Sequence, residues 1–535
     1  MAFSHNYLLF SSVLSVLAIV GNGYVWPSPV LDRMESIMFQ QSGLLREGFV
    51  DGVSPCGFGT NIEGRQNAAE WVRTAFHDMA THDAQAGTGG LDASIMFETE
   101  RPENLGSAFN NTFGFFFSFH SYRASMADLI ALGVYASLRS CNGPRVPIRV
   151  GRIDATEAGP PGVPEPTHDL DTIVSKFASM GFSKQDMIQM VACGHSLGGV
   201  HGNDFPQMVG SDSVEAFAHF DTTFANYDSA VVTEYLQDTT QNPLVKGPNE
   251  TNSDLRVFSV DGNKTMEAMA DNAVFQTTCA SILERMINTV PSNVALSEPL
   301  SPLPVKPITP KTTLNSDGTI TFEGFIRVGT TERNDTELAV TMQYANADGT
   351  TSSSNVIEAI PIRAQGGSGS GIAGDFNYNA YQFSAALTNG ISQFNVSVKP
   401  SSSGIEHYDN EGHGFPYRDD IIIQEPQSCL ISTQPDGNGN FNLTVVAAVK
   451  EKLISTPTYL QVIEKFPRQG VLIPGLVERK VEMKAFQDTT FGYKLLSGSY
   501  LLPSVSWLTE YKVINGDSQD DFRSTGSLTD SCGPF

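Results

Sequence analysis

An arginine and a histidine, Arg73 and His77, stand four residues apart in a segment whose apolar residues recur at spacings of three and four. This periodicity predicts a helix over residues 63–78, and residues four apart share one helix face. A histidine there can accept a proton and return it, and a neighbouring arginine can stabilise negative charge on a reacting oxygen. Alone, the same spacing is also typical of a pair of surface residues.

A second histidine lies in the run Gly194-His195-Ser196-Leu-Gly-Gly-Val-His. It follows a predicted helix over residues 184–194, for which Ser183 and Asp186 supply a cap and a charged first turn. Alone, this segment could arise by chance, and the histidine could be a buried, hydrogen-bonded one with no ligand.

Further motifs stand between the two histidines. They are Gly89-Gly90-Leu91-Asp92-Ala93-Ser94, Pro102-Glu103-Asn104-Leu105-Gly106, Ala127-Asp128-Leu129-Ile130-Ala131-Leu132 and Gly151-Arg152-Ile153-Asp154. Together with the two histidine segments and in this order, they resemble the plant, fungal and bacterial haem peroxidase superfamily over roughly residues 45–290. The resemblance implies a mainly α haem peroxidase domain with one haem b per chain.

The resemblance also implies a role for each reactive residue. His195 is the expected axial ligand of the haem iron, and Asp261, in the segment 255–261, is the expected carboxylate behind its imidazole. On the opposite side His77 would act as general base and then general acid toward hydrogen peroxide. Asn104 would orient His77, and Arg73 would stabilise charge on the departing oxygen.

Other positions bear on the haem and on the reducing substrate. Phe76 would pack over the haem, His201 resembles a residue that meets a haem propionate, and Phe220 stands where cytochrome c peroxidases have a radical-bearing tryptophan. Glu70 fits one acidic position of a manganese site, but the other two positions lack a carboxylate. Asp204 stands where ascorbate peroxidases have an ascorbate-contacting arginine. These departures leave a small, phenol-like donor as the expected reducing substrate.

The resemblance extends to two calcium sites, because hard oxygen ligands in loops suit calcium. The expected distal ligands are Asp78, Gly90, Asp92 and Ser94. The expected proximal ligands are Ser196, Asp221, Thr223, Asn226 and Asp228. The alternative for both sets is turn-forming Asp and Ser residues that bind only water.

The N-terminus carries an apolar run over residues 8–20, followed by Gly21-Asn22-Gly23. The run is too short to span a bilayer and matches a secretory signal, so we predict a signal peptide over residues 1–23 and an extracellular, glycosylated protein. An apolar helix of the mature fold is the alternative. No later stretch could span a membrane. Sequons support secretion and lie at Asn110, Asn249, Asn263, Asn334, Asn395 and Asn442.

Composition limits the class of protein. The chain has 535 residues, 40% of them hydrophobic, which predicts two or three folded domains. The net charge of -25 argues against a nucleic-acid or anionic-membrane partner. Its six cysteines allow a few disulfides. The resemblance implies that Cys56 pairs with Cys141. Of the other cysteines, Cys429 could pair with Cys532, and Cys193 could pair with Cys279 or be a buried thiol.

The composition and the hydrophobic periodicity of the chain change near residue 300. Helical periodicity also marks residues 126–138 and 170–180, whereas the Pro-rich residues 291–311 predict a linker. Beyond it, β-branched and aromatic runs alternate with Gly/Asn/Asp turns, which predicts an all-β, sandwich-like domain over residues 312–535. Its role is open. The loop that carries His407 and His413 could bind metal or be a solvated turn.

These observations predict a secreted haem peroxidase that uses hydrogen peroxide to oxidise small donors, with a role in the response to oxidative stress. The C-terminal domain could contact carbohydrate or a cell wall. The alternative is a haem- or carbohydrate-binding cell-wall module with a vestigial peroxidase core.

Overall fold

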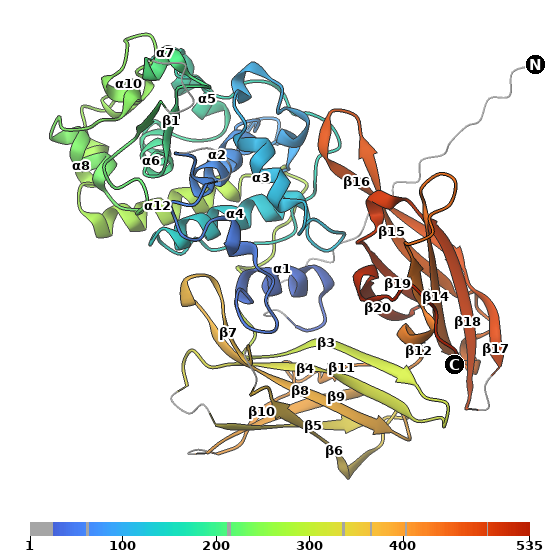
Figure 1. The fold of residues 1–535 in the computed structure, drawn as a ribbon. Coiled ribbons are helices and arrows are strands. Elements are labelled where there is room, and N and C mark those ends of the chain that lie inside the picture. The colour runs from blue at the N-terminus through green and yellow to red at the C-terminus, as the bar shows by residue number, and fades with distance from the viewer. Residues whose placement is uncertain are drawn as a thin grey trace, which may run out of the picture.

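The computed structural model (Figure 1) describes residues 25–59, 64–210, 216–333, 337–363, 366–401, 404–488 and 491–535. The predicted signal peptide, residues 1–23, and the sequon at Asn334 lie outside the described residues. The described chain forms a helical part followed by a β part, which confirms the predicted fold class. None of its helices is long and apolar enough to cross a membrane.

The helical part is built around α2 and α4, which pack against each other, and around α6, which packs against α5, α10 and α12. Its helices are α1 (Pro29–Phe39), α2 (Asn67–Met79), α3 (Ala108–Phe116), α4 (Met126–Ser140), α5 (Leu170–Ser179), α6 (Lys184–Gly194), α7 (Pro206–Val209), α8 (Ala230–Leu236), α9 (Pro243–Lys246), α10 (Ser253–Phe258), α11 (Lys264–Ala268) and α12 (Asn272–Ile287). Short strands β1 (Gly199–His201) and β2 (Phe217–His219) pair antiparallel beside them. The predicted capping box is confirmed, because Ser183 Oγ accepts the Asp186 amide and the Asp186 carboxylate accepts the Ser183 amide.

The β part divides into two units with separate apolar cores, whereas the sequence predicted one sandwich over residues 312–535. The first unit follows the strand order β10-β9-β5-β6-β8-β4-β3, with β7 on β8 and β11 on β9. Its strands are β3 (Val305–Leu314), β4 (Ile320–Gly329), β5 (Leu338–Ala345), β6 (Thr351–Pro361), β7 (Ser368–Ser370), β8 (Asn377–Leu387), β9 (Gln393–Pro400), β10 (Glu406–Tyr408) and β11 (Phe415–Pro416).

The second unit has two facing sheets, with the orders β12-β14-β18-β17 and β16-β15-β19-β20 and with β13 on β14. Its strands are β12 (Ile421–Ile423), β13 (Cys429–Ile431), β14 (Phe441–Lys450), β15 (Tyr459–Arg468), β16 (Val471–Glu482), β17 (Lys484–Asp488), β18 (Tyr493–Leu502), β19 (Glu510–Asn515) and β20 (Ser518–Ser524). Side chains of both sheets, such as Val445 and Val462, share one core. Figure 1 shows this unit beside the first one, with the helical part above.

The predicted linker over residues 291–311 is wrong from residue 305 onward, because residues 305–311 belong to strand β3. Pro307 and Pro310 lie in this strand although proline cannot donate a backbone hydrogen bond. They are tolerated because β3 is at the edge of the sheet and carries a bulge between Ile308 and Lys311.

Helix α1 joins the helical part to the first β unit, although the predicted peroxidase domain began only at residue 45. Its Phe39 belongs to the core of the helical part. Its buried Glu35 carboxylate accepts hydrogen bonds from Lys306 Nζ at 2.6 Å and Arg327 Nη1 at 3.0 Å, in β3 and β4. Burial raises the pKa of Glu35, but the charges of Arg327 and Lys306 outweigh it and lower that pKa to about 2.

The second β unit reaches the helical part through the β15–β16 hairpin. Ile473 is buried in the helical core. The Arg468 guanidinium lies 4.7 Å from the ring centre of Phe97, at the end of the 3₁₀ turn η2 (Ser94–Phe97). The hairpin therefore braces the segment that follows the predicted distal calcium ligands.

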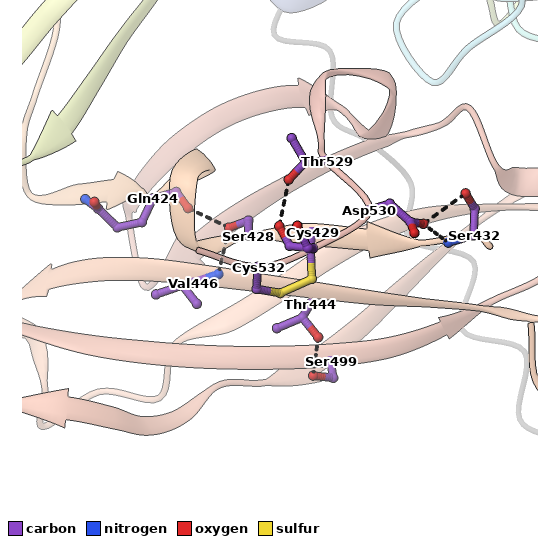
Figure 2. The surroundings of a disulfide bond; sticks show 11 residues. Gln424, Ser428, Cys429, Ser432, Thr444, Val446, Ser499, Thr529, Asp530 and Cys532 are labelled. Carbon is purple, nitrogen blue, oxygen red and sulfur yellow. Dashed lines mark hydrogen bonds between the residues drawn. A yellow bond between two sulfur atoms is a disulfide. The ribbon is translucent and has the colours of Figure 1, made fainter. Parts of the chain in front are cut away.

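Three disulfides connect the described cysteines: Cys56–Cys141, Cys193–Cys279 and Cys429–Cys532. The first pair agrees with the pairing implied by the resemblance, and the second chooses between the two alternatives for Cys193. Figure 2 shows the third bond, which ties the C-terminal residues to β13 next to the hydrogen bond between Ser432 and Asp530.

Candidate active site

Helix α2 presents three of the predicted residues to a cavity of about 350 Å³, namely Arg73, Phe76 and His77. The opposite face of the helix buries Trp71 and Ala75 in the core of the helical part. The 3.6-residue period of an amphipathic helix thus separates packing side chains from reactive ones. The sequence predicted this shared face.

The hydrogen-bond partners of His77 determine which ring nitrogen carries its proton. Its Nδ1 lies 2.8 Å from Asn104 Oδ1, and Asn104 Nδ2 donates to the Glu98 carbonyl at 3.0 Å. The amide oxygen can only accept, so Nδ1 must donate and Nε2 keeps a free lone pair. Burial, reinforced by the positive charge of Arg73, lowers the pKa of His77 to about 3 although the bond to Asn104 opposes this change. His77 is therefore neutral at neutral pH.

Arg73 is held beside that lone pair. Its Nε donates to His77 Nε2 at 3.3 Å, and its Nη2 donates to the Leu105 carbonyl at 3.1 Å. The guanidinium also lies 4.7 Å from the ring centre of Phe109, on α3. Burial lowers the pKa of Arg73 to about 10, so the side chain stays charged at neutral pH.

His195 stands at the C-terminal end of α6 and lines the same cavity as His77. Its Nδ1 lies 2.8 Å from Asp254 Oδ2. A carboxylate can only accept, so Nδ1 donates and Nε2 is left free. The Phe220 ring stacks on the imidazole with ring centres 4.3 Å apart.

The carboxylate behind His195 is Asp254, and the prediction of Asp261 is wrong. Asp254 is 1% exposed, lies in the first turn of α10, and also accepts Asn242 Nδ2 at 2.8 Å. Asp261 lies beyond the end of α10 and accepts the Thr265 amide at 3.0 Å and hydroxyl at 2.6 Å. The packing of α10 on α6 decides which aspartate meets His195. The only local signal was the Asn-Ser-Asp start of a helix.

The remaining cavity residue of the prediction, His201, lies at the end of β1 with its ring centre 4.5 Å from that of Phe217. Burial, helped by the charge of Arg65, lowers the pKa of His201 to about 4. Arg65 and Asn242 are site residues that the sequence did not point to, since their roles depend on contacts with distant segments.

The predicted distal calcium residues lie together next to His77. The Asp78 carboxylate accepts the amides of Ala93 at 2.8 Å and Ile95 at 3.0 Å, and burial together with the nearby Asp92 raises the pKa of Asp78. The Gly90 carbonyl accepts the Asp92 amide at 2.8 Å. Ser94 Oγ is buried without a hydrogen-bond partner. An orphaned oxygen between acidic groups is suited to a cation.

The predicted proximal calcium residues also meet. Asp228 accepts hydrogen bonds from Ser196 Oγ at 2.9 Å, Thr223 Oγ1 at 2.9 Å and Asn226 Nδ2 at 2.6 Å. Asp221 Oδ2 is buried without a partner, and burial together with the charge of Asp228 raises the pKa of Asp221 to about 7. A calcium ion would satisfy these oxygens and restore the ionised form.

Neither cluster has more than two carboxylates, and the described residues hold no group of three or more His, Cys, Asp or Glu suited to a metal ion. His407 lies in strand β10 and not in a loop, and the turn that follows this strand is hydrogen-bonded. His407 Nδ1 lies 3.0 Å from Ser397 Oγ, and Asp409 accepts the Gly412 amide at 3.0 Å.

Comparisons with known proteins show what the chain is similar to. A family model described as peroxidase matches residues 60–327, which reach past α12 into β4. A WSC domain-containing protein of Arthroderma benhamiae is 37% identical over 523 residues, covering 95% of this chain and 68% of that protein. A peroxisomal L-ascorbate peroxidase of Arabidopsis thaliana is 33% identical over 26% of this chain and 50% of its own length. A versatile peroxidase of Pleurotus eryngii is 27% identical over 41% of this chain and 54% of its own length.

Proposed function

Because the chain belongs to the peroxidase family, we propose that it is a haem peroxidase that uses hydrogen peroxide to oxidise small, phenol-like donors. The observation that carries this proposal is the pair of imidazoles in one cavity. His77 and His195 both have an unprotonated Nε2, yet the Nδ1 of one donates to an amide and that of the other to a carboxylate. One group suits a proton carrier and the other an axial ligand.

The residues of the cavity fit a haem. His195 offers a free Nε2 for the iron, and Phe76 and Phe220 supply apolar lining. Asp254 makes the imidazole a stronger ligand through the bond at Nδ1. When bound, the haem supplies the redox chemistry that accepts oxidising equivalents from peroxide and passes them to the donor.

His77 and Arg73 have different roles in the proposed reaction with peroxide. His77 Nε2 takes the proton from one peroxide oxygen, and the same proton then goes to the other oxygen, which leaves as water. The Arg73 guanidinium stabilises negative charge on the departing oxygen until that proton arrives. Asn104 keeps the proton of the imidazole on Nδ1, so Nε2 is ready to accept.

The proposal includes two calcium ions, secretion and glycosylation. The calcium ions would be held by the distal and proximal clusters described above, whose orphaned oxygens support them. The disulfides and the sequons support an oxidising, extracellular location. A role in the response to oxidative stress would follow from consumption of peroxide.

A stopped-flow experiment tests the enzyme directly. The haem-loaded protein is mixed with hydrogen peroxide, and its absorption spectrum is followed before and after a phenol is added. We expect a rapid change of the haem band and its return when the donor is supplied. His195→Ala should lose the normal axial ligation. An unchanged haem band with peroxide, or an unaltered ligand field in that variant, would contradict the proposal.

A second candidate function is carbohydrate binding by the first β unit. A polar cleft of about 590 Å³ opens between the ends of its strands and is lined by Arg363, Asn379, Tyr381 and Lys399, among others. A pull-down of the full chain on insoluble cell-wall polysaccharide, compared with Asn379→Ala and Lys399→Ala, tests it. Equal retention of all three proteins would assign no binding to this cleft.

A further inference from the structure

A buried ion triad borders the cavity on the side of α2. Arg65 is 6% exposed, and its Nη1 donates to Glu70 Oε1 at 2.7 Å while its Nη2 donates to Asp204 Oδ2 at 2.9 Å. The triad joins Arg65, two residues before the start of α2, to the first turn of α2 and to the loop after β1. All three side chains line the cavity.

The positive charge of Arg65 is already paired within the triad, because its guanidinium binds two carboxylates. Arg65 therefore adds no attraction for an anionic ligand. Among the described residues that line the cavity, the only basic side chains besides histidines are Arg65 and Arg73, and the acidic ones are Glu70, Glu103, Glu165, Asp204 and Asp254. His201 adds no positive charge, because its lowered pKa of about 4 keeps it neutral. The lining therefore carries net negative charge, and a bound haem would add its own two carboxylates.

Asp204 is the acid of the triad that a second molecule in the cavity can meet. Its side chain is 15% exposed against 8% for Glu70, which also accepts a bond from Asn111. Asp204 lies against Gly106, where a Cβ would come within 3.0 Å of Asp204 Oδ2 and 3.8 Å of Arg73 Nη1. Gly106 has a φ of +101° and allows this close approach of the carboxylate to the reactive side.

We infer that the cavity selects cationic or neutral phenolic donors over anionic ones, with Asp204 as the residue that determines this selectivity. The inference rests on the proposed peroxidase function, because it names the charge class of the donor. A carboxylate on a donor is repelled by the net charge of the lining, and an ammonium group is attracted. Two unit charges a few ångströms apart in water change the affinity for the donor about two- to five-fold.

The test measures donor binding without peroxide, so that it does not depend on turnover. Dissociation constants at pH 7 and low salt are measured for three phenols of similar size: tyramine, 4-ethylphenol and 4-hydroxyphenylacetate. We expect the haem-loaded protein to bind tyramine most tightly and 4-hydroxyphenylacetate most weakly. Asp204→Asn should weaken tyramine and strengthen 4-hydroxyphenylacetate by about two- to five-fold each, with 4-ethylphenol nearly unchanged. Glu250→Gln, the matched control at an exposed position outside the lining, removes the same charge and should change none of the three.

A salt series on the unaltered protein gives a second measurement that needs no variant. Raising the ionic strength from about 0.01 M to about 1 M should weaken tyramine and strengthen 4-hydroxyphenylacetate, because screening removes both effects. The inference is overturned if the three constants do not depend on donor charge, or if Asp204→Asn and Glu250→Gln act alike. Failure of the proposed function would be seen separately, as a haem that does not react with peroxide.

Discussion

The two walls of the cavity place the same side chain in different surroundings. On the α2 wall, His77 Nδ1 donates to the neutral Asn104 amide at 2.8 Å, and Arg73 stands beside Nε2. On the α6 wall, His195 Nδ1 donates to the Asp254 carboxylate at the same distance. The two histidines therefore differ in the group that the Nδ1 side of each ring meets.

In the proposed enzyme, the partner of Nδ1 sets the task of each imidazole. A neutral acceptor beside a cation leaves His77 a weak base, whose pKa is lowered to about 3 by burial and by Arg73. Such a group readily gives up any proton that it takes from peroxide. A buried carboxylate pushes electron density toward the free nitrogen of His195, which strengthens it as a metal ligand.

The largest effect is expected when the α2 wall loses its base. His77→Leu should retain the haem, because His195 and Asp254 are untouched, but slow the reaction with peroxide by about 10²- to 10⁴-fold. Stopped-flow mixing of the haem-loaded variant with peroxide measures this. A rate equal to that of the unaltered protein would reject His77 as the base.

Removing charge from the other wall should have a smaller effect. Asp254→Asn keeps the size of the side chain but replaces the carboxylate behind His195, and we expect a loss of about 10- to 100-fold in haem affinity or activity. Asp261→Asn is the matched control, because its carboxylate binds Thr265 instead. Haem titration and the spectrum of the bound haem distinguish the two variants. If Asp261→Asn gave the larger change, our assignment of the partner would be wrong.

The contrast between Asp254 and Asp261 shows what the sequence could and could not predict. The shared face of Arg73 and His77 and the Ser183/Asp186 cap depend on residues three or four apart, so periodicity was enough. The partner of His195 lies 59 residues away, and its identity depends on how α10 packs on α6.

The β part repeats this lesson on a larger scale. Alternating strands were visible in the sequence, but their division into two cores was not. Trp26, near the start of the described chain, packs against Phe394 and Phe415 in the first β unit. Glu35 pairs with Arg327 across 292 residues. No local pattern could have indicated either contact.

A change in the Nδ1 partner of His77 tests whether this partner causes the difference between the two histidines. Asn104→Asp would give the α2 wall a carboxylate behind its imidazole, as on the α6 wall, and so favour the charged form of His77. The peroxide reaction of the unaltered protein should fall only as the pH approaches about 3, where His77 takes up a proton. In the variant the pKa is raised, so the rate should fall at a pH about one to three pH units higher.

The pH profile of the peroxide rate measures this change, with Asn293→Asp as a control at an exposed position after α12. The variant also loses the bond from Asn104 Nδ2 to the Glu98 carbonyl, which costs about 1–3 kcal/mol of stability. Thermal unfolding separates that loss from the shift in the profile. Identical profiles for both variants would show that the partner of Nδ1 does not set the proton affinity of His77.

The smallest effect on rate, and a measurable one on stability, concerns the proposed calcium ions. Each histidine precedes a proposed ligand, since Asp78 follows His77 and Ser196 follows His195. An ion at a hundred times its Kd stabilises the fold by about 2.7 kcal/mol, so chelation should lower the melting temperature by a few °C. Asp221→Asn and Asp92→Asn should each remove part of that chelator sensitivity.

The two variants should not be equal. The segment after Asp92 is braced by Arg468, whose guanidinium lies over Phe97, and by the burial of Ile473 in the helical core. We therefore expect the larger fall in melting temperature for Asp221→Asn, with bound calcium counted by metal analysis in each variant. A larger fall for Asp92→Asn would mean that the β15–β16 hairpin does not stabilise the segment after Asp92, and that the proposed calcium ion there does so instead.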